Sequence, residues 1–249
     1  MNAMTKDIKI IEVDEVNSTN KYLQELIDGG ESSDFVCVRA QYQTDGRGQM
    51  GNGWESEKGE NLTFSLAIQP DFIHPVDQYI LSQMVSMAIK EVLDFYAEDI
   101  CIKWPNDIYW KEKKVAGILI ENSLSGDSID YSVIGIGLNV NQKVFNSNAP
   151  NPISLQTISP KSVDIELLFN ELLASIQKWY NLLANRSFEK IRQSYFDALY
   201  RVDGYHRYSD AEGRFSARIK SVSNDGCLHL MTEEGEERSY YFKEVVFEH

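Results

Sequence analysis

Four strand-like segments in the middle of the chain are joined by links that are too short to hold a helix. They span residues 100–103, 108–110, 115–121 and 131–140. The link at 111–114, Lys-Glu-Lys-Lys, offers only four residues. Parallel strands need a crossover of about a dozen or more residues, usually a helix, whereas antiparallel strands can be joined by short turns. The sequence therefore predicts that the last three segments pair as an antiparallel meander.

The rest of the first 200 residues predicts a mixed α+β domain around this meander, with a mainly antiparallel sheet flanked by helices. Alternating or β-branched runs predict strands over residues 8–13, 35–40 and 62–68. Apolar residues at helical spacing predict helices over about 18–28, 77–96, 164–184 and 188–200. In the helix at 77–96, the residues expected to face the core are Ile80, Met84, Met87, Ala88, Val92 and Phe95.

The chain changes character at Arg201. From there to residue 249 it consists of short strand-like runs and turns, among them Asn-Asp-Gly at 224–226, which is a strong hairpin signal between alternating runs. About 49 residues of this kind predict a small β-barrel that packs on the larger domain. We therefore expect one domain over residues 1–200 and a second over 201–249.

Composition excludes several classes of function. The formal net charge of −14 argues against DNA or RNA as the main partner, because phosphate binding needs a basic face. No apolar run approaches the roughly 18 residues of a membrane span, and the first ten residues lack the apolar core of a signal peptide, so a cytoplasmic protein is expected. Cys37, Cys101 and Cys227 lie far apart in strand-like runs and the four histidines are scattered, so we expect buried free thiols and no zinc site.

The stretch from Asp45 to Trp54 reads Asp-Gly-Arg-Gly-Gln-Met-Gly-Asn-Gly-Trp and contains the spacing Gly-x-Gly-x-x-Gly. In dinucleotide-binding folds this spacing follows a strand and opens a helix. Here a charged segment and a second strand follow, so a dinucleotide fold is not predicted. Repeated glycines still bring backbone N–H groups close to an anion, and the Arg47 guanidinium suits a carboxylate or a phosphate. The alternative is a flexible hairpin tip with a solvated arginine.

Three further stretches concentrate residues that are unusual at their positions. They are Asn-Ser-Thr-Asn at 17–20, Lys-Trp-Pro-Asn-Asp at 103–107 with the strand from Lys114 to Glu121 beyond it, and Ile-Gly-Ile-Gly-Leu-Asn-Val-Asn at 134–141. Each also has an ordinary explanation: a plain turn after Pro105, a solvent-facing lysine at 114, or a β-bulge. Together with the glycine loop, two lysines and an arginine on adjacent strands predict a site for a small molecule that carries both a carboxylate and a phosphate.

In this order the motifs resemble those of the biotin protein ligase family. Ser-Thr-Asn, Gly-Arg-Gly-x-x-Gly with its tryptophan, Lys-Trp-Pro-Asn-Asp, Lys-Val-Ala-Gly-Ile-Leu-Ile-Glu and Gly-Ile-Gly-Leu-Asn-Val-Asn cover nearly the whole chain. The resemblance implies a sheet like that of class II aminoacyl-tRNA synthetases and biotin ligases, an SH3-like C-terminal barrel, and no N-terminal DNA-binding domain. It leaves monomer and homodimer open.

The resemblance implies a reaction in two steps. ATP and biotin give biotinyl-5′-AMP and pyrophosphate, with Mg²⁺ bridging the phosphates, and a lysine of a biotin carboxyl carrier domain then attacks the mixed anhydride. One alternative is a lipoate or octanoate ligase of the same superfamily, whose substrate has no ureido head to engage polar residues. Another is a non-catalytic biotin-sensing repressor, which needs a helix-turn-helix segment and a basic surface, and neither is expected here.

The resemblance also implies a role for each site residue. Arg47, Lys114, Asp107 and Lys103 are the expected catalytic residues, and Asp107 either orients the incoming amine or contacts Mg²⁺. The residues expected to bind biotin are Ser18, Thr19, Asn20, Gln43, Arg47, Gly48, Gln49, Lys114, Gly117, Ile118 and Leu119. Those expected to bind ATP or the adenylate are Gly46, Arg47, Trp54, Asn106 and Asn139.

The glycine loop departs from the commonest bacterial pattern of this family, Gly-Arg-Gly-Arg-x-Gly-Arg. Gln49 and Asn52 stand where that pattern has arginines. Two fewer cations over the adenylate predict faster leakage of this reactive intermediate. Pro152 stands where some relatives place an aromatic residue, so the adenine pocket is less well defined by the resemblance.

Overall fold

The computed structural model describes residues 6–147, 150–159 and 163–248. Its helices are α1 (Thr19–Asp28), α2 (Tyr79–Leu93), α3 (Leu155–Ile158), α4 (Ile165–Ala184) and α5 (Phe188–Asp197), with short 3₁₀ turns at Gln49–Gly51 and Pro75–Asp77. Its strands are β1 (Lys9–Val16), β2 (Val36–Gln43), β3 (Leu62–Ile68), β4 (Ile100–Lys103), β5 (Asp107–Trp110), β6 (Lys113–Ser125), β7 (Ser128–Leu138), β8 (His206–Asp210), β9 (Gly213–Val222), β10 (Leu228–Thr232), β11 (Glu237–Tyr240) and β12 (Val246–Phe247). None of the helices within these ranges combines the length and the apolar composition that crossing a membrane requires.

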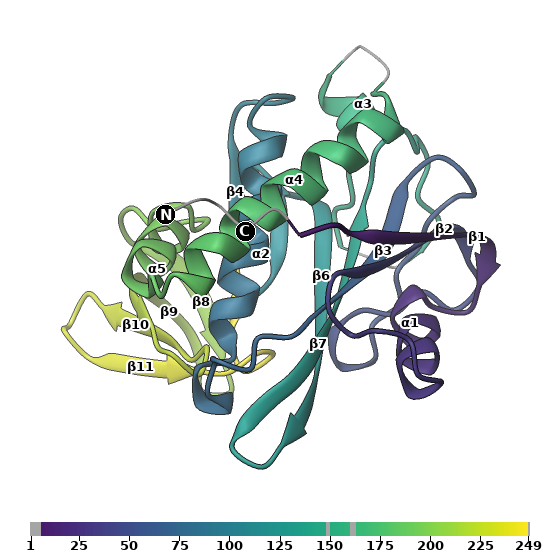
Figure 1. Ribbon diagram of the computed structural model, residues 1–249. Helices are drawn as coiled ribbons and strands as arrows, with labels where there is room; N and C mark the ends of the chain where they lie inside the picture. Colours follow the sequence, from purple (N-terminus) through teal and green to yellow (C-terminus); the bar gives the residue numbers. More distant parts are fainter. Residues whose placement is uncertain (1–5, 148–149, 160–162, 249) are drawn as a thin grey trace.

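Seven strands form the central sheet, in the order β1-β2-β3-β7-β6-β5-β4 (Figure 1). β1 and β2 run parallel, and the other neighbouring pairs of this sheet are antiparallel. The predicted three-stranded meander is confirmed as β5-β6-β7, and β4 extends it by a further antiparallel strand. The short links decide this arrangement. A parallel neighbour would need a link long enough to return the chain to the end of the sheet where the previous strand began, and none of these links is that long.

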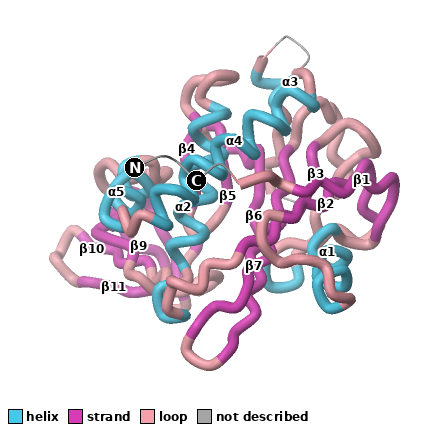
Figure 2. Tube along the Cα trace, in the orientation of Figure 1, coloured by secondary structure: helices cyan, strands magenta, loops and turns pink. Residues whose placement is uncertain are grey.

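Helices cover both faces of the central sheet. Val36 and Val38 of β2 pack with Leu23 of α1, whereas Cys37, between them, belongs to the cluster that includes α2 and α4. Successive side chains of a strand point to opposite faces, so β2 is buried on both sides. Figure 2 shows α1 apart from α2 and α4, in agreement with this division.

The helix predicted at 77–96 is shorter than expected. α2 ends at Leu93, the next residues form a turn, and Phe95 is 87% exposed. The prediction that Phe95 belongs to the core is therefore wrong, because helical spacing defines a face only while the helix continues. Met87 is half-buried. The other predicted core residues of this helix, Ile80, Met84, Ala88 and Val92, are buried.

The C-terminal strands form a second, five-stranded sheet in the order β11-β10-β9-β8-β12. The Asn-Asp-Gly turn joins β9 to β10 as predicted, with Gly226 at a φ of +88°. The predicted barrel is not closed, because the two-residue β12 pairs with β8 and leaves the far edge at β11. Instead the sheet packs on the larger part of the molecule, where the rings of Tyr200 and Phe247 stack 6.3 Å apart. The domain boundary after residue 200 stays a prediction.

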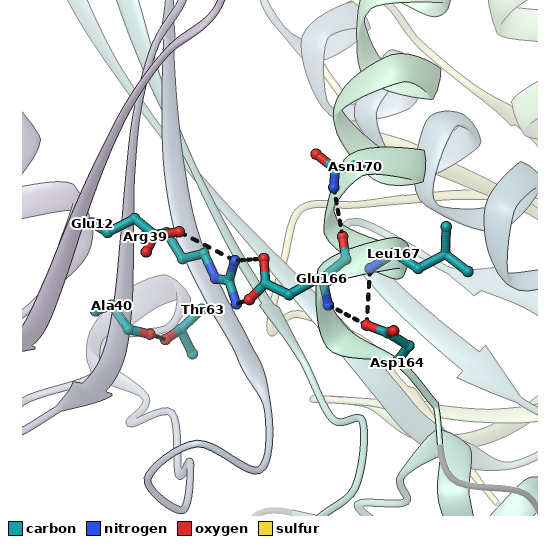
Figure 3. A network of polar contacts seen from close by, with 8 residues as sticks. All are labelled: Glu12, Arg39, Ala40, Thr63, Asp164, Glu166, Leu167 and Asn170. Atoms are coloured by element: carbon teal, nitrogen blue, oxygen red, sulfur yellow. Dashed lines mark hydrogen bonds and ion pairs between the residues drawn. The ribbon is translucent and has the colours of Figure 1, made fainter.

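An ion pair between buried Arg39 and exposed Glu166 joins helix α4 to the sheet (Figure 3). Arg39 on β2 is 4% exposed and donates to both carboxylate oxygens of Glu166, with 2.7 Å between Nη1 and Oε2. Glu166 lies in the first turn of α4. Its backbone N–H donates to the side chain of the N-cap residue Asp164 at 2.9 Å. The hydrogen bonds from Arg39 hold the pKa of Glu166 below its usual value. The pair therefore joins the start of α4 to the strand that leads into the glycine loop.

All three cysteines are free, as predicted. Cys37 and Cys227 are buried, whereas Cys101 on β4 is only partly buried, so the expectation of full burial holds for two of them. Burial raises the pKa of Cys37 to about 12 and that of Cys101 to about 11. Thiols of this kind are unreactive at neutral pH because little thiolate is present.

Candidate functional site

A pocket lies on the central sheet beneath the glycine loop. Its lining combines residues from all four of the stretches that stand out in the sequence. The predicted site residues that line it are Ser18, Thr19, Asn20, Gln43, Arg47, Gly48, Gln49, Trp54, Asn106, Asp107, Lys114, Gly117, Ile118 and Leu119. The fold thus brings together side chains that lie as far apart in the sequence as Ser18 and Leu119.

The glycine loop is a narrow turn between β2 and β3. The backbone N–H of Trp54 donates to the carbonyl of Gly46 at 2.8 Å and closes the base of the turn. At its tip, Met50 and Gly51 both have positive φ, 52° and 80°. The loop contains one short 3₁₀ turn and no α-helix, as expected from the strand that follows it.

Arg47 pairs with a neighbouring carboxylate in its own loop. Its Nη2 lies 2.9 Å and its Nε 3.2 Å from Asp45 Oδ2. The two side chains are 53% and 61% exposed, so this pair is solvated and contributes about 0–1 kcal/mol. An anion that enters the pocket can therefore replace Asp45 as the partner of Arg47 at small cost.

Two glycines on the sheet leave space for the Trp54 indole. A Cβ at Gly137 would lie 2.3 Å from indole Cε2, and one at Gly117 would lie 3.2 Å from Cζ3. Lys114 Nζ lies 5.7 Å from the centroid of the ring. The indole Nε1 is buried and has no hydrogen-bond partner among the described residues. The ring therefore forms a wall of the pocket beside its cationic end.

At the other end of the pocket, Thr19 and Gln43 form a polar group that hydrogen bonds hold in place. Gln43 Oε1 accepts hydrogen bonds from the backbone N–H of Thr19 at 2.8 Å and from its hydroxyl at 3.1 Å. The buried Ser65 hydroxyl lies 2.7 Å from Thr19 Oγ1 and 2.6 Å from Asn20 Oδ1. Asn20 donates to Glu121 Oε2 at 2.6 Å. These hydrogen bonds hold Thr19 and Gln43 in one arrangement.

Lys114 and Asp107 form an ion pair at the cationic end. Lys114 Nζ lies 2.6 Å from Asp107 Oδ1, and the side chains are only 24% and 25% exposed. They come from the paired strands β6 and β5, next to a bulge in the register. The chain beyond β7 returns alongside Lys114, whose backbone N–H donates to Asn151 O and whose carbonyl accepts from Ile153 N, each at 2.9 Å.

Lys103 does not line the pocket. Its Nζ lies 3.3 Å from the Tyr109 hydroxyl and 5.3 Å from the centroid of the Phe247 ring, in the contact with the C-terminal sheet. Burial lowers the pKa of this ammonium. Lys103 is nevertheless the direct partner of Asp107 across β4 and β5, and the charges of both Asp107 and Lys114 act on it. A catalytic role for Lys103 stays a prediction.

Gly46 and Asn139 also lie outside the lining. A Cβ at Gly46 would lie 2.5 Å from the Trp54 carbonyl oxygen, so glycine is needed there to close the loop. Asn139 is 2% exposed and donates to Ile153 O at 3.2 Å, while its Oδ1 has no partner among the described residues. Contact of either residue with an adenylate stays a prediction.

Some lining residues are not among the predicted site residues. They are Asn52, Gly53, Gly135, Ile136, Gly137 and Phe242. The Ile-Gly-Ile-Gly run is the sequence signal that marks Gly135 and Gly137. The structure explains the first of these glycines, because a Cβ at Gly135 would lie 2.2 Å from Asn20 Oδ1. Phe242 comes from the turn between β11 and β12, and no local sequence signal marks it. The same is true of Ser65, which supports the polar end from behind.

Known proteins resemble this chain in both sequence and structure. The model of the biotin/lipoate A/B protein ligase family matches residues 12–139. The bifunctional ligase/repressor BirA of Bacillus spizizenii is 29% identical over 238 residues, which cover 93% of this chain and 72% of the relative. The biotin–[acetyl-CoA-carboxylase] ligase of Paracoccus denitrificans is 30% identical over 186 residues, which cover 72% and 76%. The structure of a biotin protein ligase from Aquifex aeolicus in complex with biotin and ATP matches with a TM-score of 0.77 and 27% identity, over 96% of this chain and 97% of that chain.

Proposed function

The chain belongs to the biotin/lipoate A/B protein ligase family, and from that premise we propose that it activates biotin with ATP and transfers it to a lysine of a carrier domain. It is an ATP-dependent biotin protein ligase that acts through biotinyl-5′-AMP. The observation that carries this conclusion is that Thr19, Gln43 and the Lys114–Asp107 pair line one pocket together with residues of the glycine loop.

In the first step, a carboxylate oxygen of biotin attacks the α-phosphorus of ATP, the new oxygen–phosphorus bond forms and pyrophosphate leaves. Two anions must approach each other, so fixed positive charge lowers the barrier. Arg47 supplies charge from the loop and Lys114 from the sheet. Arg47 exchanges its solvated partner Asp45 for the phosphate, and Trp54 keeps the loop over the reacting atoms.

In the second step, the neutral amine of the carrier lysine attacks the acyl carbon of the adenylate. An amide bond forms, the bond from the acyl carbon to the AMP oxygen breaks, and the amine loses a proton. Asp107 is the proposed group that orients the amine or accepts this proton. Its position is fixed by Lys114, 2.6 Å away, which also stabilises the charge on the departing AMP.

The polar end of the pocket is the proposed site for the ureido head of biotin. Ser18, Thr19 and Gln43 lie there, with Ile118 and Leu119 against the apolar rings and chain. Lipoate and octanoate carry no ureido group, so neither would gain hydrogen bonds here, each of which contributes about 0.5–1.5 kcal/mol. This difference favours biotin over the substrates of the sister enzymes.

The pocket fits a Mg²⁺ ion that is held mainly by the nucleotide. Within the part of the chain that the structure describes, Asp107 is the one carboxylate that lines the pocket, and no group of three or more His, Cys, Asp or Glu side chains is arranged to hold a metal. Mg²⁺ in nucleotide sites is usually bound by phosphate oxygens, water and one or two carboxylates. As the alternative to its role toward the amine, Asp107 would contribute one such ligand, and the ion would neutralise phosphate charge.

The proposed acceptor is a biotin carboxyl carrier domain of a biotin-dependent carboxylase. The Paracoccus relative, named as a ligase for acetyl-CoA carboxylase, supports this choice. A cytoplasmic location and the absence of DNA binding stay predictions, and monomer and homodimer both stay open. The excess of acidic residues, a net charge of −14, supports the second of these.

ATP–pyrophosphate exchange tests the proposal directly. The purified protein is incubated with ATP, Mg²⁺ and labelled pyrophosphate, in parallel with biotin, lipoate or octanoate. We expect exchange with biotin alone. Exchange with lipoate or octanoate instead would move the chain to the sister enzymes, and no exchange with any of the three would contradict the proposed activity.

A further inference from the structure

Two tyrosine hydroxyls hold the backbone of the Lys-Trp-Pro-Asn-Asp turn. The carbonyl of Pro105, which is buried, lies 2.9 Å from the hydroxyl of Tyr79 and 3.1 Å from that of Tyr195. The two hydroxyls lie 2.7 Å from each other. Tyr79 comes from α2 and the fully buried Tyr195 from α5, so two helices meet at one carbonyl.

The hydroxyls of Tyr79 and Tyr195 supply two protons for three short contacts: one from each hydroxyl to the Pro105 carbonyl and one between the two hydroxyls. Burial raises the pKa of both tyrosines, so both hydroxyls stay protonated at neutral pH. At any moment one hydroxyl can donate to Pro105 O while the other donates to the same oxygen or to the first hydroxyl. If one hydroxyl is lost, the other still binds the carbonyl. If both are lost, the remaining polar neighbour is Ser82 Oγ at 3.4 Å.

The C-terminal sheet provides a third support for the same turn. Trp104, which is 5% exposed, donates its indole N–H to the carbonyl of Gly226 at 2.9 Å. Gly226 belongs to the β9–β10 turn and packs so closely that a Cβ there would lie 2.6 Å from Tyr79 Cδ2. The turn from Trp104 to Asn106 is therefore held from α2 and α5 through the Pro105 carbonyl and from the second sheet through the Trp104 side chain.

The turn carries the two polar residues that follow Pro105 into the pocket. Asn106 donates from Nδ2 to the carbonyl of Ile118, and Asp107 pairs with Lys114. Neither Tyr79 nor Tyr195 lines the pocket. We propose that Tyr79 and Tyr195 are positioning residues for the ligase reaction, which place Asp107 and Asn106 through the Pro105 carbonyl, and that the C-terminal sheet shares this task through Trp104. The proposal rests on the proposed function, because it assigns Asp107 to the transfer step.

The test compares Tyr79→Phe, Tyr195→Phe and the double variant with Tyr180→Phe as matched control. Tyr180 is also a buried tyrosine whose hydroxyl donates to a backbone carbonyl, that of Gln69 at 3.3 Å, but it lies outside the pocket and the turn. Single-turnover transfer from preformed biotinyl-AMP to a carrier domain is measured below the unfolding transition of each variant. A misplaced reacting group can cost roughly 100-fold in rate, so we expect about that loss in the double variant and about threefold or less in each single variant. Biotin affinity should fall less than the transfer rate, because Thr19 and Gln43, the proposed partners of the ureido head, make their hydrogen bonds away from the turn.

Backbone hydrogen exchange at residues 106–108 gives a readout that does not depend on activity. It should accelerate in the double variant and not in Tyr180→Phe. If the double variant does not fold, Trp104→Phe serves instead, with about a tenfold loss of transfer rate expected. Transfer and exchange in the double variant that match Tyr180→Phe would overturn the positioning role. Wild-type protein without biotin-dependent activity would instead contradict the proposed function, and hydrogen exchange would then decide the positioning role alone.

Discussion

Gly117 and Gly137 decide where the Trp54 indole lies. Any side chain at residue 137 would occupy the position of the ring, because a Cβ there would lie 2.3 Å from it. The ring in turn borders Lys114, at 5.7 Å from Nζ to the centroid. Glycine is therefore required at residues 117 and 137 because the Trp54 ring, from a distant loop, lies against them.

Asp107→Asn should slow the transfer step much more than the activation step. The amide keeps the size of the side chain but loses the capacity to accept a proton. We expect transfer to a carrier domain to fall about 100-fold to 1,000-fold and biotin-dependent pyrophosphate exchange to change by less than about threefold. Single-turnover transfer and exchange are measured on the same preparation, with Asp127→Asn at the exposed β6–β7 turn as control. An equal loss in both steps would assign Asp107 to adenylation instead.

Gln49→Arg restores one of the cations that the commonest bacterial loop carries. Gln49 lines the pocket, and its Oε1 is buried without a partner among the described residues. We expect an arginine here to slow leakage of the adenylate several-fold, to about the extent of one charge-assisted hydrogen bond. Biotin transfer to a foreign primary amine measures leakage, and Gln49→Met controls for the change in size. Equal leakage from the arginine variant and the natural chain would contradict the prediction.

At the scale of elements, α4 depends on a contact that its own sequence does not provide. Arg39 on β2 binds Glu166 in the first turn of the helix, and its guanidinium lies 4.8 Å from the centroid of the Phe169 ring. Asp164 caps the same turn. A carboxylate at the start of a helix also interacts favourably with the helix dipole. Glu166 therefore stabilises the start of α4 in two ways, through its ion pair with Arg39 and through its interaction with the helix dipole.

Glu166→Gln tests this contact through its pH dependence. The hydrogen bonds from Arg39 lower the pKa of folded Glu166 below its ordinary value of 4.5. The stabilisation is therefore fully present above pH 4.5 and is lost as the pH falls through the lower folded value. Because Glu166 is 67% exposed, solvent screening limits the effect to about 1 kcal/mol at pH 7.

Urea unfolding at pH 7 and at about pH 3 measures the free energy of unfolding of Glu166→Gln and the natural chain. The difference between them should shrink at the lower pH. Glu189→Gln, which breaks an exposed pair with Arg192, serves as control and should change stability little at either pH. A difference for Glu166→Gln that is the same at both pH values would show that the charge of Glu166 is not the source of the stabilisation.

At the scale of the whole molecule, the C-terminal sheet completes the pocket. Phe242 lines it, and Lys243 donates from Nζ to the carbonyl of Met50 at 3.1 Å. Met50 is at the tip of the glycine loop, so the second sheet contacts the loop that covers the pocket. A chain without this sheet would lose one wall of the pocket as well as the contact with Trp104.

Lys243→Met tests the contact with the loop. The methionine keeps an unbranched apolar chain and removes the donor. One exposed hydrogen bond contributes about 0.5–1.5 kcal/mol, so we expect the bound adenylate to dissociate roughly two- to tenfold faster. Dissociation is followed by competition with excess unlabelled biotin and ATP, and Lys220→Met on the same sheet is the control. Identical dissociation from the two variants would contradict the prediction.

The residues of the site were largely accessible from the sequence because each of the four stretches carries its own local signal. Repeated glycines, a Pro-Asn-Asp turn and a lysine at the start of a strand are properties of neighbouring residues, and the short links around them allow only antiparallel pairing. These local features mark the four stretches that line the pocket, whereas individual residues such as Ser18, Thr19 and Gln43 follow from the family resemblance. Phe95 shows their limit, because a helical pattern does not say where the helix ends.

The sequence by itself determined which residues are suited to bind an anion and that β5, β6 and β7 pair as a meander. The tertiary structure alone decided that Lys103 lies outside the pocket lining, that Phe242 belongs to it, and that Tyr79 and Tyr195 converge on Pro105. These contacts join residues far apart along the chain, up to the 193 positions between Lys243 and Met50. The physical reason is that local preferences act between neighbours, whereas the partner of a distant side chain is set by how complete elements pack together.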